Sequence, residues 1–214
     1  MASEEGVLRL YHNNYDTFNR MKDAIVEKFK ADCDMVHTIK SRIKSEDSFA
    51  NKVRRKIAEQ PGMDSEEIYS SVSDILGIRL ITVFPIDVIS VHNYIRRITH
   101  GKSKQYYMIE QIGYCWDPEI KAKLRSLKIK ITEKESYYNS IHYVLSTNGE
   151  GSHKFEVQVR TLLDEAWSEV DHKLKYKNNP HAGVANHIKV YSSIVSAGLR
   201  TLTAIEDITD NLSL

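Results

Sequence analysis

The sequence predicts an α+β fold: a mixed β-sheet of about five strands, flanked by helices, with a helical extension at each end of the chain. Three observations support this fold. Apolar residues recur at helical spacing near both ends, five segments between them resemble strands, and the two patterns interleave. With 214 residues, 41% of them hydrophobic, the chain is long enough for one sizeable domain with a packed core.

The helices are predicted from periodicity and capping residues. In the N-terminal segment, aromatic and aliphatic residues from Tyr11 to Phe29 recur at steps of three and four. A second helix begins near Ser45 or Asp47, which are good N-caps, and Pro61 stops it. Further helices are expected at residues 86–98, after Thr161 and at residues 187–210. The last helix has an apolar stripe that could pack on its own core or on a second copy of the chain.

The strands are predicted from composition and alternation. They are expected at residues 75–84, 104–114, 127–132, 140–147 and 154–161. The first is apolar apart from Arg79 and rich in β-branched residues, which is typical of a buried central strand. The last alternates apolar residues with Glu156, Gln158 and Arg160, so these three side chains should share one face of the sheet.

Composition and motifs exclude several classes of protein. The formal net charge is +1, so no overall field marks a general nucleic-acid binder. Cys33 and Cys115 are far apart, which argues against a disulfide framework or a thiolate zinc site. The sequence contains no Walker A motif, no H-E-x-x-H and no His-Asp dipeptide. It has a polar N-terminus and no apolar run of membrane-spanning length, so we expect a cytoplasmic protein without a membrane partner.

Polar and basic side chains gather around the start of the second helix. Arg42 and Lys44 precede the helix, and offsets of four and three place Ser48, Lys52 and Arg55 on one helical face. Cationic side chains and the free N–H groups of a helix start both favour anions, so this group can cradle a polyphosphate. A solvated basic face is the alternative that spacing alone leaves open.

Two acidic residues occupy strand positions. Asp74 stands directly before the apolar strand, and Glu156 lies in the alternating one. Mg²⁺ prefers oxygen ligands and is usually held by one or two carboxylates together with substrate phosphates, so the two acids could share this ion. A surface or capping role remains the alternative for each acid taken alone.

Five segments together resemble the synthetase domain of the RelA/SpoT family. In chain order they are SRIKSEDSFANKVRRK, DILGIRLITVF, YYNSIHYVL, FEVQVRTLLDEAW and EVDHKLKYK. The resemblance places this domain at residues 37–178, between an N-terminal helical extension at 1–36 and a C-terminal one at 179–214. Its length resembles that of the small, stand-alone alarmone synthetases.

The resemblance implies a reaction and a role for each motif residue. The reaction is a Mg²⁺-dependent transfer of the β,γ-pyrophosphate of ATP to the 3′-hydroxyl of GDP or GTP, which makes (p)ppGpp and releases AMP. Asp74 would be a magnesium ligand, and Glu156 would help hold the metal or accept the proton of the attacking hydroxyl. The implied ATP-binding residues are Arg42, Lys44, Ser48, Lys52 and Arg55. The implied acceptor-binding residues are Lys134, Tyr138, His142, Gln158 and Arg160, with the Tyr138 ring stacking on the base.

The sequence departs from the family pattern in two places. Tyr137-Tyr138-Asn139-Ser140 stands where many members have Gly-Tyr-Arg-Ser, which puts a bulky residue and no cation beside the acceptor. Asp171 replaces the usual Glu before His172.

The first departure keeps a second acceptor open, the 3′-CCA end of tRNA, which a toxin branch of the small synthetases pyrophosphorylates. The lysines that could meet tRNA phosphates are Lys28, Lys30, Lys173, Lys175 and Lys177. An adenine nucleotide acceptor, an antitoxin partner and a homo-oligomer also remain open. A pseudoenzyme that only binds a nucleotide is disfavoured, because Asp74, Glu156 and the basic group are all retained.

Overall fold

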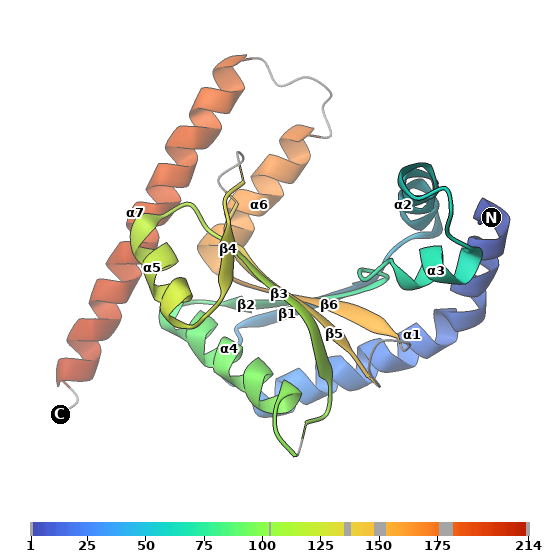
Figure 1. The fold of residues 1–214 in the computed structure, drawn as a ribbon. Helices are drawn as coiled ribbons and strands as arrows, with labels where there is room; N and C mark the ends of the chain where they lie inside the picture. Colours follow the sequence, from blue (N-terminus) through green and yellow to red (C-terminus); the bar gives the residue numbers. More distant parts are fainter. Residues whose placement is uncertain (1, 103, 135–137, 148–152, 176–181, 213–214) are drawn as a thin grey trace.

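A six-stranded mixed sheet forms the centre of the molecule (Figure 1). The computed structural model describes residues 2–102, 104–134, 138–147, 153–175 and 182–212. The elements in chain order are α1 (Glu4–Asp32), β1 (Thr38–Ile43), α2 (Glu46–Glu59), α3 (Ser65–Ser70), β2 (Leu76–Thr82), α4 (Pro85–Thr99), β3 (Tyr107–Tyr114), α5 (Pro118–Ser126), β4 (Lys130–Thr132), β5 (Ser140–Ser146), β6 (Lys154–Thr161), α6 (Leu162–Lys175) and α7 (Ala182–Leu212).

The strand order is β1-β2-β6-β5-β3-β4. The pairs β2–β6 and β3–β4 are parallel, and the other neighbours are antiparallel. All five predicted strands are confirmed, whereas β1 was not predicted. The reason is that β1 is an edge strand with three exposed residues and none fully buried, so it lacks the apolar pattern of a buried strand.

Helices α1 and α4 cover one face of the sheet (Figure 1). Phe18 and Phe29 of α1 and Ile95 of α4 belong to the same buried cluster as Leu80 and Val157 of the sheet. The N-terminal helix therefore contributes directly to the main hydrophobic core. Two short helices, α3 and α5, were not predicted, because each is too short to show helical periodicity.

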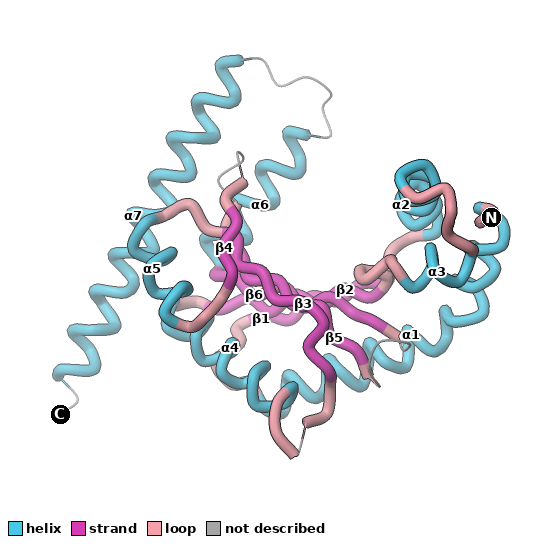
Figure 2. Tube along the Cα trace, in the orientation of Figure 1, coloured by secondary structure: helices cyan, strands magenta, loops and turns pink. Residues whose placement is uncertain are grey.

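The opposite face of the sheet lies between α2 and α6, which stand on the same side of it (Figure 2). Helix α6 packs against α7, and Trp167, Val195 and Leu199 form a small second core there. The apolar stripe predicted for α7 is divided between two sides of the helix. Its buried side includes Val195 and Leu199, whereas Ile194 and Ile208 are exposed.

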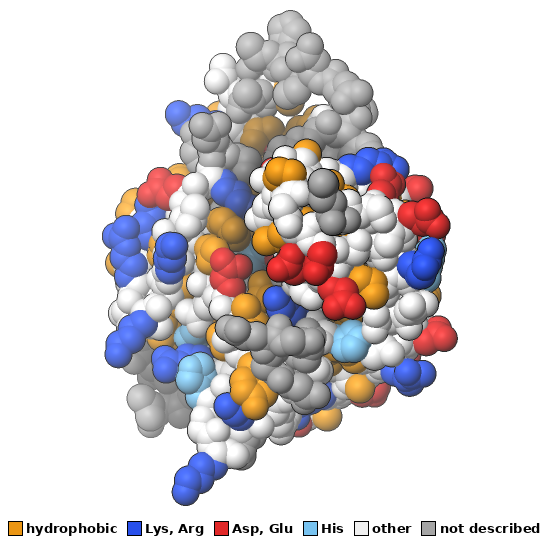
Figure 3. Space-filling model, turned by 45° about the vertical axis from the view of Figure 1, so that its right-hand side comes forward, with side chains coloured by type: hydrophobic (Ala, Val, Ile, Leu, Met, Phe, Trp, Pro, Cys, Tyr) orange, Lys and Arg blue, Asp and Glu red, His pale blue; other side chains and the backbone are white. Residues whose placement is uncertain are grey.

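The surface agrees with the near-neutral composition. On the face that Figure 3 presents, basic and acidic side chains are interspersed. Within the part of the chain that the structure describes, no helix combines the length and the apolar character needed to cross a membrane.

Candidate active site

Polar side chains of three neighbouring strands line a cavity of about 360 Å³ on the face between α2 and α6. The strand register places Arg42, Gly77 and Glu156 in one row across the sheet. The next row contains Arg79 and Gln158, which pair in register across β2 and β6. Helix α6 completes the wall with Ser168, Glu169 and His172. The cavity therefore combines cationic and anionic groups from four elements that are distant in sequence.

Asp74 is the centre of an ion cluster at one end of this cavity. Its two carboxylate oxygens contact Lys52 Nζ at 2.7 Å and Lys44 Nζ at 3.0 Å. Burial by itself raises the pKa of Asp74, but hydrogen bonds from the two lysines hold the pKa below its ordinary value. Asp74 is therefore ionised at neutral pH and neutralised by two cations.

Two other residues expected in the ATP-binding group lie elsewhere. Ser48 interacts with Ser45, the N-cap of α2, and so takes part in capping the helix. Arg55 is exposed and pairs only loosely with Glu59, at 3.7 Å. Lys44 and Lys52 pair with Asp74, which lines the cavity together with Arg42. Neither Ser48 nor Arg55 lines the cavity or pairs with Asp74, so the structure does not bring these two residues to the group.

Glu156 is held by a chain of hydrogen bonds. One of its oxygens lies 2.8 Å from His142 Nδ1, and the other accepts a hydrogen bond of 3.0 Å from Gln158 Nε2. Burial by itself raises the pKa of Glu156, but the bonds from His142 and Gln158 hold it below its ordinary value. Burial lowers the pKa of His142. The pair is therefore an ionised carboxylate that accepts from a neutral imidazole.

The other nitrogen of His142 connects this chain to Tyr138. His142 Nε2 lies 2.9 Å from the Tyr138 hydroxyl, which donates to it when Nδ1 carries the proton. Two cations approach the Tyr138 ring, with Lys134 Nζ at 4.6 Å and Arg160 Cζ at 5.1 Å from its centroid. The structure thus places Lys134, Tyr138 and His142 together, beside Glu156.

Arg160 lies on the predicted face of β6 but does not line the cavity with Glu156 and Gln158. Only 2% of Arg160 is exposed, and its Nη2 donates to Gln158 Oε1 at 2.6 Å. Its Nε and Nη1 atoms are buried without a hydrogen-bond acceptor among the described residues, although Nη1 lies 3.5 Å from Glu165. Arg160 instead lines a second cavity.

The departure at residue 139 has a structural explanation. Asn139 Nδ2 donates to Asp164 Oδ1 at 3.1 Å, and Asp164 is only 7% exposed. Burial raises the pKa of Asp164, even though Thr161 and Asn139 donate hydrogen bonds to it. The side chain at position 139 thus turns inward to α6. Tyr137 lies outside the described residues.

Sequence reasoning missed four charged residues around this site. Arg79 Nη1 contacts Glu165 Oε1 at 2.8 Å and Glu169 Oε1 at 3.4 Å, and Lys40 Nζ contacts Glu165 Oε1 at 2.7 Å. Arg79 had a signal, because it is the one charged residue in an otherwise apolar strand. Glu165 and Glu169 had none, because acidic residues on a helix are usually solvated.

Of the lysines proposed to meet tRNA, two lie away from this site. Lys28 and Lys30 lie on α1, which covers the opposite face of the sheet, and they pair with Asp32 and Glu27. Lys173 is exposed on α6. Lys177 and the side chain of Lys175 lie outside the part of the chain that is described.

Comparison with known sequences matches residues 41–181 to the family described as "Region found in RelA / SpoT proteins". Two curated relatives are from Bacillus subtilis (strain 168). GTP pyrophosphokinase YwaC is 30% identical over 143 residues, which are 67% of this chain and 59% of that protein. GTP pyrophosphokinase YjbM is 24% identical over 155 residues, 70% of this chain and 61% of that protein. The chain thus spans about three fifths of the length of the curated relatives it matches.

Solved structures share the fold. Small alarmone synthetase 2 from Bacillus subtilis has a TM-score of 0.69 at 21% identity, with 92% of this chain and 98% of that one covered. Small alarmone synthetase 1 from the same organism, bound to its product pppGpp, has a TM-score of 0.64 at 21% identity, with 94% and 97% covered. The same protein bound to AMPCPP has a TM-score of 0.62 at 20% identity, with 95% and 97% covered.

Proposed function

The chain belongs to the RelA/SpoT family, and from this premise we propose that it transfers the β,γ-pyrophosphate of ATP to the 3′-hydroxyl of GDP or GTP. The products would be (p)ppGpp and AMP. The names of the two curated relatives and the nucleotides bound to the solved relatives support this proposal. The observation that carries it is that Asp74, which pairs with Lys44 and Lys52, lines one cavity with Glu156.

The donor side of the site consists of Arg42, Lys44, Lys52 and Asp74. Two lysines on one carboxylate form a cluster that a polyphosphate can rearrange, because phosphate oxygens compete with Asp74 for the ammonium groups. The lysines then bind the phosphates of ATP, and the oxygens of Asp74 become available. Arg42 and Arg79 add two more cations to the same cavity. This gives the charge neutralisation on which phosphoryl-type transfer depends.

We also propose Mg²⁺ as the cofactor, held by Asp74 and Glu156. Both acids line one cavity, and the charge of Asp74 acts on the pKa of Glu156. No group of three or more His, Cys, Asp or Glu residues that could hold a metal occurs among the described residues, which suits an ion that takes one or two carboxylates and completes its shell with phosphates. When bound, the ion would neutralise charge on the transferring group.

The acceptor side consists of Lys134, Tyr138, His142, Glu156 and Gln158. Glu156 would accept the proton of the 3′-hydroxyl, because its low pKa keeps it ionised and neutral His142 holds one oxygen in place. The Tyr138 ring would stack on the base. Lys134 lies close enough to this ring to meet the acceptor phosphates.

The experiment uses ATP labelled at the γ-phosphate, offered with GDP, GTP, ATP or deacylated tRNA in separate reactions. We expect label in GDP and GTP, and none with the Glu156→Gln variant. Deacylated tRNA is included because Tyr137 and Asn139 depart from the family pattern. Label in tRNA alone would replace the nucleotide acceptor with tRNA, and label in no acceptor would make the chain a binding protein.

A further inference from the structure

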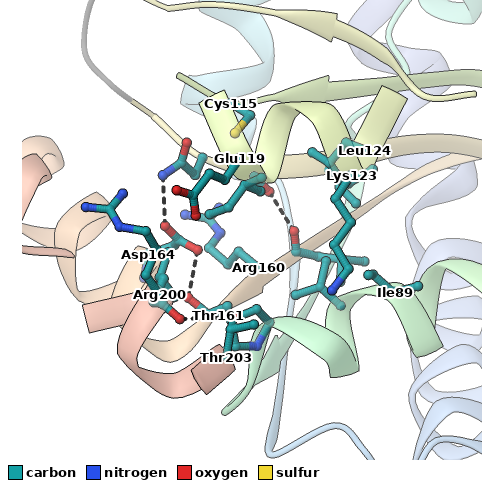
Figure 4. Close-up of a pocket in the computed structure, with 18 of the residues that line it drawn as sticks. Ile89, Cys115, Glu119, Lys123, Leu124, Arg160, Thr161, Asp164, Arg200 and Thr203 are labelled. Atoms are coloured by element: carbon teal, nitrogen blue, oxygen red, sulfur yellow. Dashed lines mark hydrogen bonds between the residues drawn. The ribbon is translucent and has the colours of Figure 1, made fainter. Parts of the chain in front are cut away.

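A second cavity, of about 370 Å³, lies at the end of β6 between α4, α5 and α7 (Figure 4). Most of its wall is apolar and includes Val88, Ile89, Leu124, Ile141 and Leu199. Its volume falls within the range of about 300–1,000 Å³ that is usual for small-molecule sites, which combine an apolar lining with a few polar groups. None of the donor-side residues lines it, so it is separate from the nucleotide cavity.

A buried cation in the wall is only partly satisfied. Arg160 is almost fully buried, and its Nε and Nη1 atoms make no hydrogen bond with the described residues, although Nη1 lies 3.5 Å from Glu165. A buried donor without an acceptor destabilises the fold, and more so when the group is charged. Such donors are therefore usually satisfied by a water, an ion or a ligand. An anionic oxygen is the best partner for a guanidinium.

A second cation stands at the rim. Lys123 of α5 lines the cavity, and no carboxylate of the described residues pairs with it. The other basic residue of this region, Arg200, is already neutralised by the buried Asp117 at 2.6 Å. Three acids also line the cavity. Asp164 is buried and accepts hydrogen bonds from Thr161 and Asn139, whereas Glu119 and Asp207 are exposed and can turn to solvent. Arg160 and Lys123 are therefore the cations of the wall and rim that an anionic group can reach.

We propose that this cavity binds a small, mainly apolar molecule with one anionic head, such as a carboxylate. The apolar body contacts the aliphatic side chains of α4, α5 and α7. The head accepts hydrogen bonds from Arg160 or pairs with Lys123. A neutral molecule of the same shape gains the apolar contacts but gives Arg160 Nε and Lys123 no anionic acceptor.

The position of Arg160 connects this cavity to the acceptor side. Arg160 Nη2 donates to Gln158, and its guanidinium lies 5.1 Å from the Tyr138 ring centroid. Asn139, which also lines the cavity, directly follows Tyr138. A ligand that engages Arg160 therefore changes the groups that hold the acceptor, while the donor side stays as it was. This regulatory step rests on the proposed function, whereas the binding step does not.

The test measures binding first and uses no nucleotide. Anilinonaphthalene sulfonate, an aromatic anion that fluoresces in apolar surroundings, is titrated into the full chain and displaced with octanoate or with octanol. We expect octanoate to displace it at concentrations about tenfold lower than octanol, because hydrogen bonds between charged groups are stronger than those to a neutral hydroxyl. In Lys123→Met this preference for the anion should shrink. In the matched variant Arg125→Met, on the same helix but outside the cavity, it should remain.

Two alanines of α7 give a second pair of variants. Ala204 lines the cavity and Ala197 does not, and both are exposed. Ala204→Trp should fill the mouth and weaken dye binding at least about tenfold, equivalent to 1.36 kcal/mol, whereas Ala197→Trp should bind as the wild type does. Equal binding by both variants, or no binding by the wild type, would overturn the proposal.

The regulatory step is tested separately by measuring transfer in the presence of octanoate. We expect the KM for the acceptor to change by about fivefold or more in the wild type and in Ala197→Trp, with the KM for ATP unchanged. Ala204→Trp should show no response. An active enzyme that ignores octanoate would overturn this step. A protein that binds octanoate but transfers nothing would contradict the proposed function and leave the binding site in place.

Discussion

On the donor side of the cavity, Asp74 contacts two lysines, whereas on the acceptor side Glu156 is held by neutral His142 and Gln158. Both carboxylates have a pKa below the ordinary value, but different partners hold it there. The donor side is a set of charges that can exchange partners when a polyphosphate arrives. The acceptor side is a chain of directional hydrogen bonds that fixes one side chain. Mutations should therefore affect the first side through charge and the second through geometry and proton transfer.

Removing the charge at the centre of the donor side should have the largest effect. We expect Asp74→Ala to lower the rate of transfer by about a thousandfold or more, since loss of a metal ligand costs several kcal/mol of barrier. Circular dichroism should show an intact fold, and Asp34→Ala, in an exposed loop, is the control. Activity of Asp74→Ala within about tenfold of the wild type would contradict the assignment.

On the acceptor side, Glu156→Gln keeps the shape of the side chain and removes its charge. We expect turnover to fall about a hundredfold to a thousandfold, in the range of general acid–base contributions, while the affinity for ATP measured by calorimetry stays near that of the wild type. Glu110→Gln, on the exposed part of β3, is the control. If ATP affinity were lost together with turnover, Glu156 would belong to the donor side.

The residue that follows His142 on β5 also takes part in a hydrogen bond between a tyrosine and a histidine, but this one lies inside the core. Tyr143 lies 2.8 Å from Nδ1 of His92, which is fully buried, and burial lowers the pKa of His92 to about 4. The unfolded chain takes up this proton near pH 6.5, whereas folded His92 takes it up only near pH 4. Acidification from pH 6.5 to about pH 4 therefore lowers the free energy of unfolding. His92 accounts for about 3 kcal/mol of this loss at the acidic end of the range.

Urea unfolding at pH 7 and at pH 4.5 checks this expectation. The difference in unfolding free energy between the two pH values should be smaller in His92→Gln than in the wild type. It should be unchanged in His37→Gln, because His37 is exposed. An equal pH dependence in all three proteins would show that His92 is not held neutral.

The smallest expected effect separates two arginines that the sequence placed together. We expect Arg42→Ala to raise the KM for ATP about tenfold, because Arg42 lines the donor side of the cavity. Arg55→Ala should change it less than about twofold, since Arg55 is exposed and pairs loosely with Glu59. Steady-state kinetics with varied ATP checks both variants. Equal effects would mean that α2 moves toward the cavity when ATP binds.

Local sequence patterns predict the helices and strands that bury one face at regular spacing. Strand β6 was predictable because Phe155, Val157 and Val159 face the core and alternate with polar residues, which also grouped Glu156 with Gln158. Strand β1 was not, because an exposed edge strand needs no apolar face. The periodicity of α7 predicted a helix, but it could not show that Ile194, Ile205 and Ile208 face away from the core.

The sequence predicted those site residues that lie together on one helix or strand, or in one family motif. Spacing on α2 predicted a face with Ser48, Lys52 and Arg55, yet this face is wider than the cavity, and only Lys52 reaches Asp74. The contacts of Arg79 with Glu165 and Glu169 join elements about 86–90 residues apart, so no local pattern could predict them. The inward turn of Asn139 likewise depends on a buried carboxylate of α6.

The last strand of the chain, β6, lies in the middle of the sheet, between β2 and β5. During synthesis, β1 and β2 emerge first and β3, β4 and β5 follow, but the strand that joins the two groups leaves the ribosome only afterwards. Until then the nascent chain has unpaired strand edges, which are prone to aggregation and attract chaperones. It also lacks Glu156, to which we assign the proton transfer, so we expect a chain that stops early to have no activity. A cell that made this protein would therefore gain its activity in a single step, late in the production of each molecule.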